Sequence, residues 1–332
     1  MTTMTTMKAV ILDAKGHYEV TDRPVPAPGA GEVAVRVEYA GIQWGDTMVK
    51  DGHFPVPRPF VPGFEVAGRI VAVGEGVDER RIGGPVAVLT SAGGYAEVVV
   101  APAVLALPAG RLSLRTAAAF GWSTPTAFDL INTSARVRPG ESVLIHAAAG
   151  GVGTQAVQFA RLAGAGRITG VVGSPERAAY ADKFGYDQVL LRRDFPTALG
   201  DEKFDVILDP IGAETRRESL RLLAPHGRLV AYGNIGGYAP VLVDTNELLM
   251  QGRSLLTYNS SLLSGTHPER LAASARTALA LVAEGKVRVD ITAEYELSEL
   301  ALAVGRLADG GTRGKSIVRI GGPAEGENIR TV

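Results

Sequence analysis

One continuous segment, SVLIHAAAGGVGTQAVQFAR at 142–161, constrains this chain most. A buried strand pattern runs into a turn of small residues, and a helix pattern starts near Val152. Ala148, Gly150 and Gly153 fall at the three glycine positions of the G-x-G-x-x-G fingerprint. Small residues there permit a tight turn, close approach of the backbone to a pyrophosphate, and close helix–strand packing. The segment predicts a phosphate-binding loop made of Ala148, Gly150, Gly151, Val152 and Gly153; a purely structural turn is the less favoured alternative.

The residues around and after this loop alternate between strand and helix patterns. Apolar, strand-like runs occur at 142–147, 167–172, 188–191, 204–209, 227–233 and 254–258. Amphipathic helix patterns lie between most of them, which is typical of a parallel sheet covered on both faces. Six strands in this rhythm match a doubly wound Rossmann domain, which we predict for residues 123–261.

The remainder of the chain predicts a second domain. Residues 7–108 form short strand-like runs separated by Pro and Gly clusters, which indicates an irregular all-β unit. After Tyr258 the patterns are a long helix at 268–286, a strand near 287–291, a helix at 297–311 and a closing strand at 316–320. Because this last part has too few strands for a sheet of its own, we place it against the N-terminal unit. The predicted fold class is α/β, with a discontinuous catalytic domain at 1–122 and 262–332. The ends at 1–6 and 321–332 are expected to be loosely held.

Charge and composition narrow the classes of partner and chemistry. Among 332 residues, 34 Lys and Arg nearly balance 35 Asp and Glu, so no broad field attracts nucleic acid or an anionic membrane surface. The N-terminal apolar run of five residues is too short for a signal peptide or a membrane span, and we expect a cytoplasmic protein. The absence of cysteine excludes disulfides, a thiolate nucleophile and Cys-ligated zinc.

The cofactor type follows from the end of the second strand of the series. Where an Asp or Glu would bind the ribose 2′-hydroxyl of NAD, this chain has Ser174, with Arg177 one turn later and Arg192 and Arg193 after the next strand. A hydroxyl with guanidinium groups suits a 2′-phosphate, because guanidinium binds phosphate bidentately. We therefore predict NADPH. The alternative is that these arginines are solvated surface residues without a role in cofactor binding. This alternative has more weight for Arg192 and Arg193 than for Arg177.

Several motifs in this order resemble a known family along almost the whole chain: PGFEVAGRIVAVGEGV, GGYAEVVVA, TPTAFDLI, HAAAGGVGTQAVQFAR, YGNIGG and LADGGTRGKSIVRI. Together they resemble the medium-chain dehydrogenase/reductase superfamily, and within it the zinc-independent quinone oxidoreductase and enoyl reductase-like branch. The resemblance implies a GroES-like catalytic domain beside the Rossmann domain, with the active site in the cleft between them.

The same resemblance allows the zinc ligands of zinc-dependent relatives to be compared with this chain. Zinc-dependent relatives have a histidine before the glutamate of a G-H-E motif and a cysteine near the position of Gly41. This chain has Phe64 before Glu65 and no cysteine. With two of three ligand types missing, we expect no metal site, and we expect Glu65 to be a buried acceptor or ion-pair partner.

The resemblance also implies residues that act on the substrate. The segment at 40–55 resembles the one that lines the nicotinamide pocket in the branch, with Gln43 where asparagine is usual and Asp46 at a recurring aspartate. Met48 and Phe54 stand where some enoyl reductases carry a tyrosine, so a phenolic acid is absent. Asn259 follows the sixth strand, at the edge where ligands bind in such sheets. The expected catalytic residues are Gln43, Asp46 and Asn259, and a protonated Asp46 would require burial to raise its pKa.

Further residues are expected at the cofactor. Thr126 resembles a threonine that contacts the nicotinamide ribose or amide, and Gly233 and Asn234 match a glycine and an asparagine beside the nicotinamide. Lys315 resembles a lysine near the cofactor, with a surface lysine as an equal alternative. His146 is interpreted as a packed neutral histidine rather than a base.

The combined interpretation is a zinc-independent NADPH-dependent reductase that transfers hydride to a quinone or to the C=C of an α,β-unsaturated carbonyl. The alternatives are a biosynthetic, polyketide-type enoyl reductase and a non-catalytic NADPH-binding structural or sensor protein. The strand at 254–258 should lie at the end of its sheet, where pairing with a second copy would give a homodimer. An edge covered by the chain's own C-terminal helix is the alternative.

Overall fold

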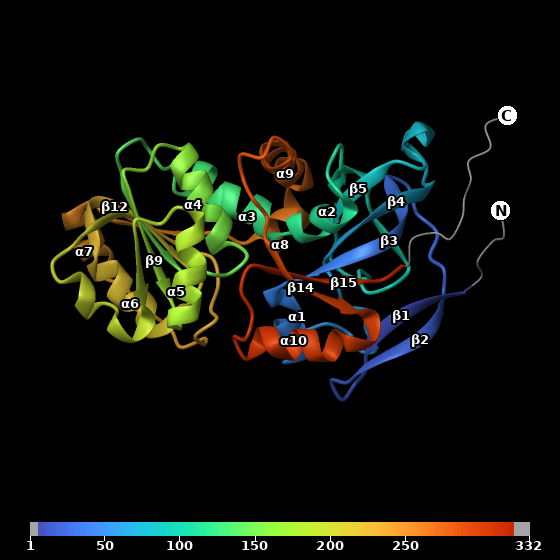
Figure 1. Cartoon of the computed structure of the whole chain (residues 1–332), viewed down its shortest axis with the longest axis horizontal. Coiled ribbons are helices and arrows are strands. Elements are labelled where there is room, and N and C mark those ends of the chain that lie inside the picture. The colour runs from blue at the N-terminus through green and yellow to red at the C-terminus, as the bar shows by residue number, and fades with distance from the viewer. Residues whose placement is uncertain (1–5, 322–332) are drawn as a thin grey trace. The chain divides into compact units, whose positions relative to one another are not determined.

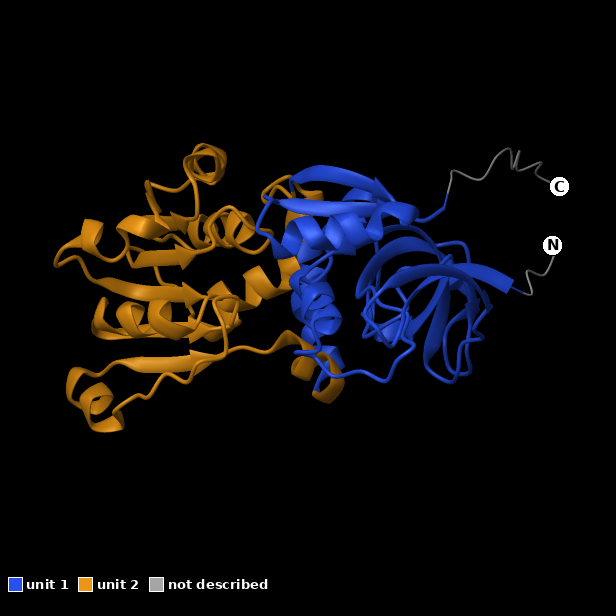
Figure 2. Cartoon of the chain, turned by 90° about the horizontal axis from the view of Figure 1, so that it is seen from below, with its two compact units in different colours: residues 1–122, 267–279, 290–332 blue, residues 123–266, 280–289 orange. Residues whose placement is uncertain are grey.

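The computed structural model describes residues 6–321, which form two compact units (Figure 2). Unit 1 contains the chain up to Trp122, then 267–279, and the chain from Asp290 onward. Unit 2 contains Ser123–Thr266 and Ala280–Val289. Unit 1 is therefore assembled from segments far apart in the sequence.

Unit 2 is built on a six-stranded parallel sheet. Its strands are β8 (Ser142–His146), β9 (Arg167–Val172), β10 (Gln188–Leu191), β11 (Phe204–Asp209), β12 (Leu223–Ala231) and β13 (Ser254–Thr257). Their order across the sheet is β10-β9-β8-β11-β12-β13, with parallel pairing throughout. This is the doubly wound Rossmann order, so the predicted fold is confirmed. The predicted position of β13 at one end of the sheet is also confirmed.

Helices cover both faces of this sheet. Figure 1 shows α4 (Gly153–Leu162) and α5 (Pro175–Ala181) on one face and α6 (Ala213–Arg221) and α7 (Thr245–Gln251) on the other. Phe204, Ile207 and Leu229 are fully buried in the core between sheet and helices. The near-continuous apolar character of the strands thus matches burial on both faces. Unit 2 begins with α3 (Ser123–Asp129) and a π-helical turn at Leu130–Ser134.

Unit 1 is β-rich. Its main sheet has the order β14-β15-β3-β4-β5-β7, with β6 also paired to β3. The strands are β3 (Glu32–Ile42), β4 (Glu65–Val73), β5 (Pro85–Leu89), β6 (Val98–Pro102), β7 (Ala106–Pro108), β14 (Ile291–Glu296) and β15 (Lys315–Arg319). A separate two-stranded sheet pairs β1 (Thr6–Leu12) with β2 (Tyr18–Pro24). Strand β15 lies antiparallel to β3, so the closing segment pairs with a strand of the N-terminal part of the chain.

Helices of unit 1 lie around this sheet: α1 (Trp44–Lys50), α2 (Leu114–Phe120) and α10 (Leu300–Ala308). Helix α8 (Ser260–Thr266) belongs to unit 2, and α9 (Pro268–Ala283) contributes residues to both units. The short 3-10 turns of the chain cover Glu79–Arg81, Ala103–Leu105, Asp182–Phe184, Arg192–Asp194, Thr197–Leu199 and Leu297–Glu299.

Four expectations about local structure were wrong. Helix α1 lies inside a segment predicted to be all-β, because a seven-residue helix is too short to show a helical period. Strand β2 was missed because YEVTDRP is largely exposed and has no apolar run. Strand β14 begins at Ile291, several residues later than predicted. Thr6, expected in a loose end, starts β1; the other residues of the expected loose ends lie outside the described part, except Gly321.

Candidate functional site

The phosphate loop is the turn between β8 and α4. Helix α4 begins at Gly153 with Val152 as its N-cap, as predicted. A Cβ at Gly153 would lie 2.5 Å from the carbonyl oxygen of Ala147 and 2.7 Å from Cα of Ala148, so only glycine permits this packing. Ala147 itself has φ 53°, a left-handed conformation that costs free energy for a residue other than glycine. The loop thus combines close packing with local backbone strain, both of which are common at ligand-binding turns.

Most of the predicted cofactor residues lie at one edge of the unit 2 sheet. Because all six strands are parallel, their carboxyl ends meet at the same edge, where ligands bind in such sheets. The predicted residues that follow a strand at this edge are Ala148, Gly150, Gly151, Val152 and Gly153 after β8, Ser174 and Arg177 after β9, Arg192 after β10, Gly233 and Asn234 after β12, and Asn259 after β13.

Two arginines approach each other beside the end of β9. Burial lowers the pKa of Arg177, and the positive charge of Arg192 lowers it further. The two guanidinium groups are therefore close enough to repel each other, which a bound anion would relieve. Ser174 is the N-cap of α5, accepting from the backbone N–H of Arg177 at 3.4 Å, and its hydroxyl also bonds to Glu176 and lowers the pKa of that carboxyl. Arg193 instead lies at the surface, where its Nε is 3.8 Å from Oδ1 of Asp194.

A second buried network at this edge was missed in the sequence. The Oδ2 atom of Asp209, at the end of β11, accepts from Nε of Arg216 on α6 at 2.6 Å. The same guanidinium donates to the carbonyl of Gly233 at 2.6 Å and to Oδ1 of Asn234 at 3.2 Å. Oδ1 of Asp209 accepts from the N–H groups of Ile211 and Gly212. The network fixes the turn after β12; the only signal in the sequence was an aspartate ending a buried strand.

His146 is fully packed. Burial lowers its pKa to about 4, with the negative charge of Asp209 opposing and the positive charge of Arg192 adding to the shift. Its Nε2 lies 2.9 Å from Oγ of Ser219, and its ring packs edge-on against Phe195. The packed environment expected for His146 is present, and its lowered pKa favours the neutral form.

In unit 1, Gln43 and Asp46 cap α1 together. The side chain of Gln43 accepts from the N–H of Gly45, and Oδ2 of Asp46 accepts from the N–H of Gln43 at 2.9 Å. Oδ2 also accepts from the hydroxyl of Tyr95 at 2.9 Å, whereas Oδ1 has no hydrogen-bond partner among residues 6–321. Asp46 is only 1% exposed, and burial raises its pKa to about 7. The burial that a protonated Asp46 requires is therefore present.

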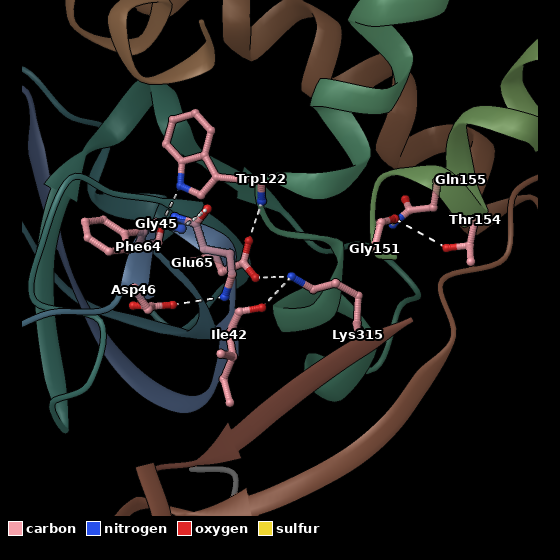
Figure 3. Close-up of polar contacts among 12 residues, drawn as sticks. Ile42, Gly45, Asp46, Phe64, Glu65, Trp122, Gly151, Thr154, Gln155 and Lys315 are labelled. Carbon is pink, nitrogen blue, oxygen red and sulfur yellow. Dashed lines mark hydrogen bonds and ion pairs between the residues drawn. The ribbon is translucent and has the colours of Figure 1, made fainter. Parts of the chain in front are cut away.

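Glu65 lies in an enclosed ion pair, shown in Figure 3. The Nζ atom of Lys315 donates to Oε1 of Glu65 and, at 3.1 Å, to the carbonyl of Ile42. Oε2 of Glu65 accepts from the N–H of Trp122 at 2.6 Å. A Cβ at Gly41 would clash with this carboxylate, so the backbone there has to approach it closely. The expectation that Glu65 is a buried ion-pair partner is confirmed.

The remaining predicted residues have the following environments. Lys315 is 3% exposed, so the surface alternative for it is wrong, and its cofactor contact stays a prediction. Oδ1 of Asn259 caps α8 by accepting from the N–H of Leu262 at 3.0 Å. Thr126 is a buried residue of α3. Gln43 and Asp46 belong to unit 1, and Asn259 and Thr126 to unit 2.

Between residues 6 and 321, no group of three or more His, Cys, Asp and Glu side chains is placed to hold a metal ion. Within that same range, none of the helices has the length and apolar character needed to cross a membrane.

Two family models match the chain. The alcohol dehydrogenase GroES-like domain matches residues 29–111, within unit 1, and the family described as zinc-binding dehydrogenase matches residues 151–279. A quinone oxidoreductase of Pseudomonas aeruginosa is 34% identical over 311 residues, which cover 90% of this chain and 94% of the relative. A phthioceranic/hydroxyphthioceranic acid synthase of Mycobacterium tuberculosis is 31% identical over 318 residues, 92% of this chain but only 15% of the synthase.

Solved structures agree with these sequence relatives. The crystal structure of Escherichia coli quinone oxidoreductase complexed with NADPH has a TM-score of 0.84 and 30% identity, over 94% of this chain and 99% of that one. The β-rich unit, the Rossmann unit and the ordered motifs all match this relationship. The chain is an oxidoreductase that uses a nicotinamide cofactor, and it belongs to the quinone oxidoreductase branch of the medium-chain dehydrogenase/reductase superfamily.

Proposed function

We propose that this protein is a metal-independent, NADPH-dependent reductase whose acceptor is a quinone or the C=C of an α,β-unsaturated carbonyl. The nicotinamide cofactor, when bound, supplies the hydride. The protein residues have to bind and orient the cofactor and to stabilise the oxygen on which negative charge develops.

The carboxyl edge of the unit 2 sheet fits NADPH. The loop at 147–153 packs so closely that a side chain at Gly153 is excluded, and helix α4 directs its positive end toward this loop. Ser174 and Arg177 follow β9 and Arg192 follows β10, and a hydroxyl with guanidinium groups suits a ligand with a 2′-phosphate better than one with a 2′-hydroxyl. The turn holding Gly233 and Asn234 is fixed by Arg216. These residues would hold the cofactor.

One observation carries the metal-independent part of the proposal: the ammonium group of Lys315 forms an ion pair with the carboxylate of Glu65. Both carboxylate oxygens are used, one by Lys315 and one by Trp122. Phe64 stands beside Glu65 where zinc-dependent relatives have histidine. A cation site at Glu65 is therefore filled by the chain itself.

The groups available for the acceptor are amides and one carboxyl. Gln43 and Asn259 carry amide N–H groups, and each uses its carbonyl oxygen to cap a helix, which leaves the amide nitrogen for donation. Asp46 has a pKa near 7 and can hold or release a proton at neutral pH. We assign to Gln43 and Asn259 the stabilisation of the developing oxygen charge and to Asp46 a proton relay.

The test is the oxidation of NADPH, followed by its absorbance, with three acceptor classes: quinones such as 1,4-benzoquinone and 9,10-phenanthrenequinone, small enones, and enoyl thioesters. Turnover with quinones or enones supports the proposal. Turnover restricted to enoyl thioesters would favour a polyketide-type enoyl reductase, for which the similarity to the mycobacterial synthase is the motivating observation. Tight NADPH binding without turnover on any acceptor would overturn the proposal in favour of a binding protein.

A further inference from the structure

Unit 1 contains two buried carboxyl groups and one buried ammonium in a single cluster, which we define as Asp46, Glu65 and Lys315. All three side chains are at most 3% exposed. The charges of Glu65 and Lys315 both act on Asp46, with opposite sign. One positive charge cannot neutralise two carboxylates, so the cluster has to distribute a proton between them or leave a buried negative charge uncompensated.

The hydrogen bonds of the two carboxyl groups are unequal. Both oxygens of Glu65 have donors: Nζ of Lys315 for one, and the N–H of Trp122 for the other (Figure 3). In Asp46, within the part of the chain that the structure describes, only Oδ2 has donors, and Oδ1 is buried with no partner. An ionised carboxylate with one unbonded buried oxygen is costly, whereas a protonated one is much less so.

We propose that Lys315 is a positioning residue that, by pairing with Glu65, leaves Asp46 as the carboxyl group that carries the proton of this cluster. The ammonium group of Lys315 is a fixed cation inside the cluster. The carboxyl group that pairs with it stays ionised, and the other carboxyl group is the one that is protonated. The role of that acid in turnover rests on the proposed function, but the distribution of the proton does not.

Every charged or titratable group around Asp46 is compatible with this assignment. Tyr95 donates to Oδ2. The hydroxyl of Tyr18 on β2 is buried without a hydrogen-bond partner in the described part of the chain, and burial, with the charge of Asp46 adding to it, raises the pKa of Tyr18. Helix α10 packs against α1, and its single charged residue, Arg306, points to Tyr295. Arg58 binds the carbonyls of Val49 and Lys50 at the other end of α1, near Asp51.

The experiment measures the infrared C=O band of a protonated carboxyl in the full-length protein without substrate, titrated from about pH 5 to pH 9, where ordinary carboxyl groups are already ionised. The band that Asp46→Asn removes belongs to Asp46. We expect it at pH 6 in the wild type, with a midpoint near 7. Glu65→Gln should lower that midpoint by about 1 unit or more, because the freed ammonium then favours ionised Asp46.

Three further variants complete the test. Glu65→Gln combined with Lys315→Met removes both charges of the pair and should return the midpoint to near the wild-type value. Glu141→Gln breaks an ion pair with Arg228 in unit 2 and should leave the band unchanged. If Glu65→Gln does not fold, Glu65→Asp withdraws the carboxylate from Lys315 and should shift the midpoint in the same direction.

The proposal is wrong if the wild type shows no Asp46 band at pH 6, or if neither Glu65→Gln nor Glu65→Asp moves its midpoint. The pH profile of kcat is recorded in parallel for the same variants. A shifted infrared midpoint without a matching shift in kcat would retain the proton distribution and overturn only the relay role that we assign to Asp46.

Discussion

Nε of Arg216 donates a 2.6 Å hydrogen bond to Oδ2 of Asp209, which connects helix α6 to the end of β11. Asp209 is completely buried, and the guanidinium group continues to Gly233 and Asn234. A residue on α6 thus determines where the backbone of a predicted cofactor turn lies. The geometry requires a planar group with several donors, which lysine cannot replace.

Arg216→Lys should therefore weaken NADPH binding while it retains a positive charge beside Asp209. Loss of the bonds to Gly233 and Asn234 should raise the Kd by about 10-fold, the equivalent of roughly 1.4 kcal/mol. Fluorescence titration with NADPH measures the effect. Arg217→Lys, at an exposed pair with Glu214, is the matched control and should leave the Kd unchanged. An unchanged Kd in Arg216→Lys would show that this turn does not contact the cofactor.

Arg177→Ala should discriminate between the two nicotinamide cofactors. Loss of one charge-assisted phosphate contact costs about 1.5–3 kcal/mol, so the Kd of NADPH should rise by about 10- to 150-fold and that of NADH hardly at all. Isothermal titration with both cofactors provides the comparison. Arg193→Ala serves as the control, because this arginine pairs with Asp194. Equal weakening of NADPH and NADH would contradict the assignment of the 2′-phosphate site.

Two buried groups should give opposite dependences of stability on pH. Burial raises the pKa of Asp46 to about 7, so the native state binds more protons than the unfolded chain between about pH 4 and 7, and this contribution to stability is lost as the pH rises. The pKa of His146 is lowered to about 4, so its contribution is lost as the pH falls from about 6.5 to 4.

The two dependences can be separated by substitution. Asp46→Asn retains His146, so its melting temperature should rise from pH 4.5 to pH 6.5. His146→Asn retains Asp46, so its melting temperature should fall over the same range. Across its whole titration, each remaining group should change the free energy of unfolding by roughly 3–4 kcal/mol. Calorimetry at closely spaced pH values measures both. Identical profiles for the two variants would contradict the opposite directions of these pKa shifts.

Activity should not depend on metal. Dialysis against EDTA or 1,10-phenanthroline is expected to leave NADPH oxidation intact, because the carboxylate of Glu65 is already paired with the ammonium group of Lys315. Elemental analysis should find no stoichiometric zinc. Activity that disappeared with chelator and returned with zinc would overturn this part of the proposal.

Strand β13 should mediate a homodimer. Among the described strands it is bonded on one side only, to β12, and Leu255 and Leu256 are half-buried. Leu256→Pro removes a backbone N–H from this edge and should dissociate the dimer before the monomer unfolds, whereas Leu256→Ala keeps the N–H and should not. Sedimentation equilibrium measures the mass. A single wild-type species of 34.7 kDa across micromolar concentrations would contradict the dimer.

The Rossmann unit was predictable because its evidence is local. Each strand is a short apolar run, and the loop at 148–153 carries its own fingerprint. Helix α1 and strand β2 were not predictable, because one is seven residues long and the other is exposed in a two-stranded ribbon. Periodicity requires length and a buried face, and these elements lack one or both.

The parts of the candidate site that could be predicted are those whose contacts join residues close together in the sequence. The candidate residues after β8, β9, β10, β12 and β13 lie at one edge of the sheet, because the carboxyl ends of parallel strands meet there, and their contact with the cofactor stays a prediction. The partner of Glu65 was not found, since Lys315 is 250 positions away and no pattern in the chain connects them. Arg216 was overlooked for another reason: in ETRRES it resembles the exposed Arg217 beside it, and only the fold directs it to a buried carboxylate.

The separation of Glu65 from Lys315 has a consequence for synthesis on the ribosome. All six strands of unit 2 have been made by Thr257 and its last segment by Val289, whereas the sheet of unit 1 is incomplete until β15 emerges. The later domain in the sequence can therefore fold on the nascent chain while the earlier one waits, with Glu65 still lacking its cation. A polypeptide released before residue 315 would retain this defect, so translation to that point is a condition for a folded unit 1.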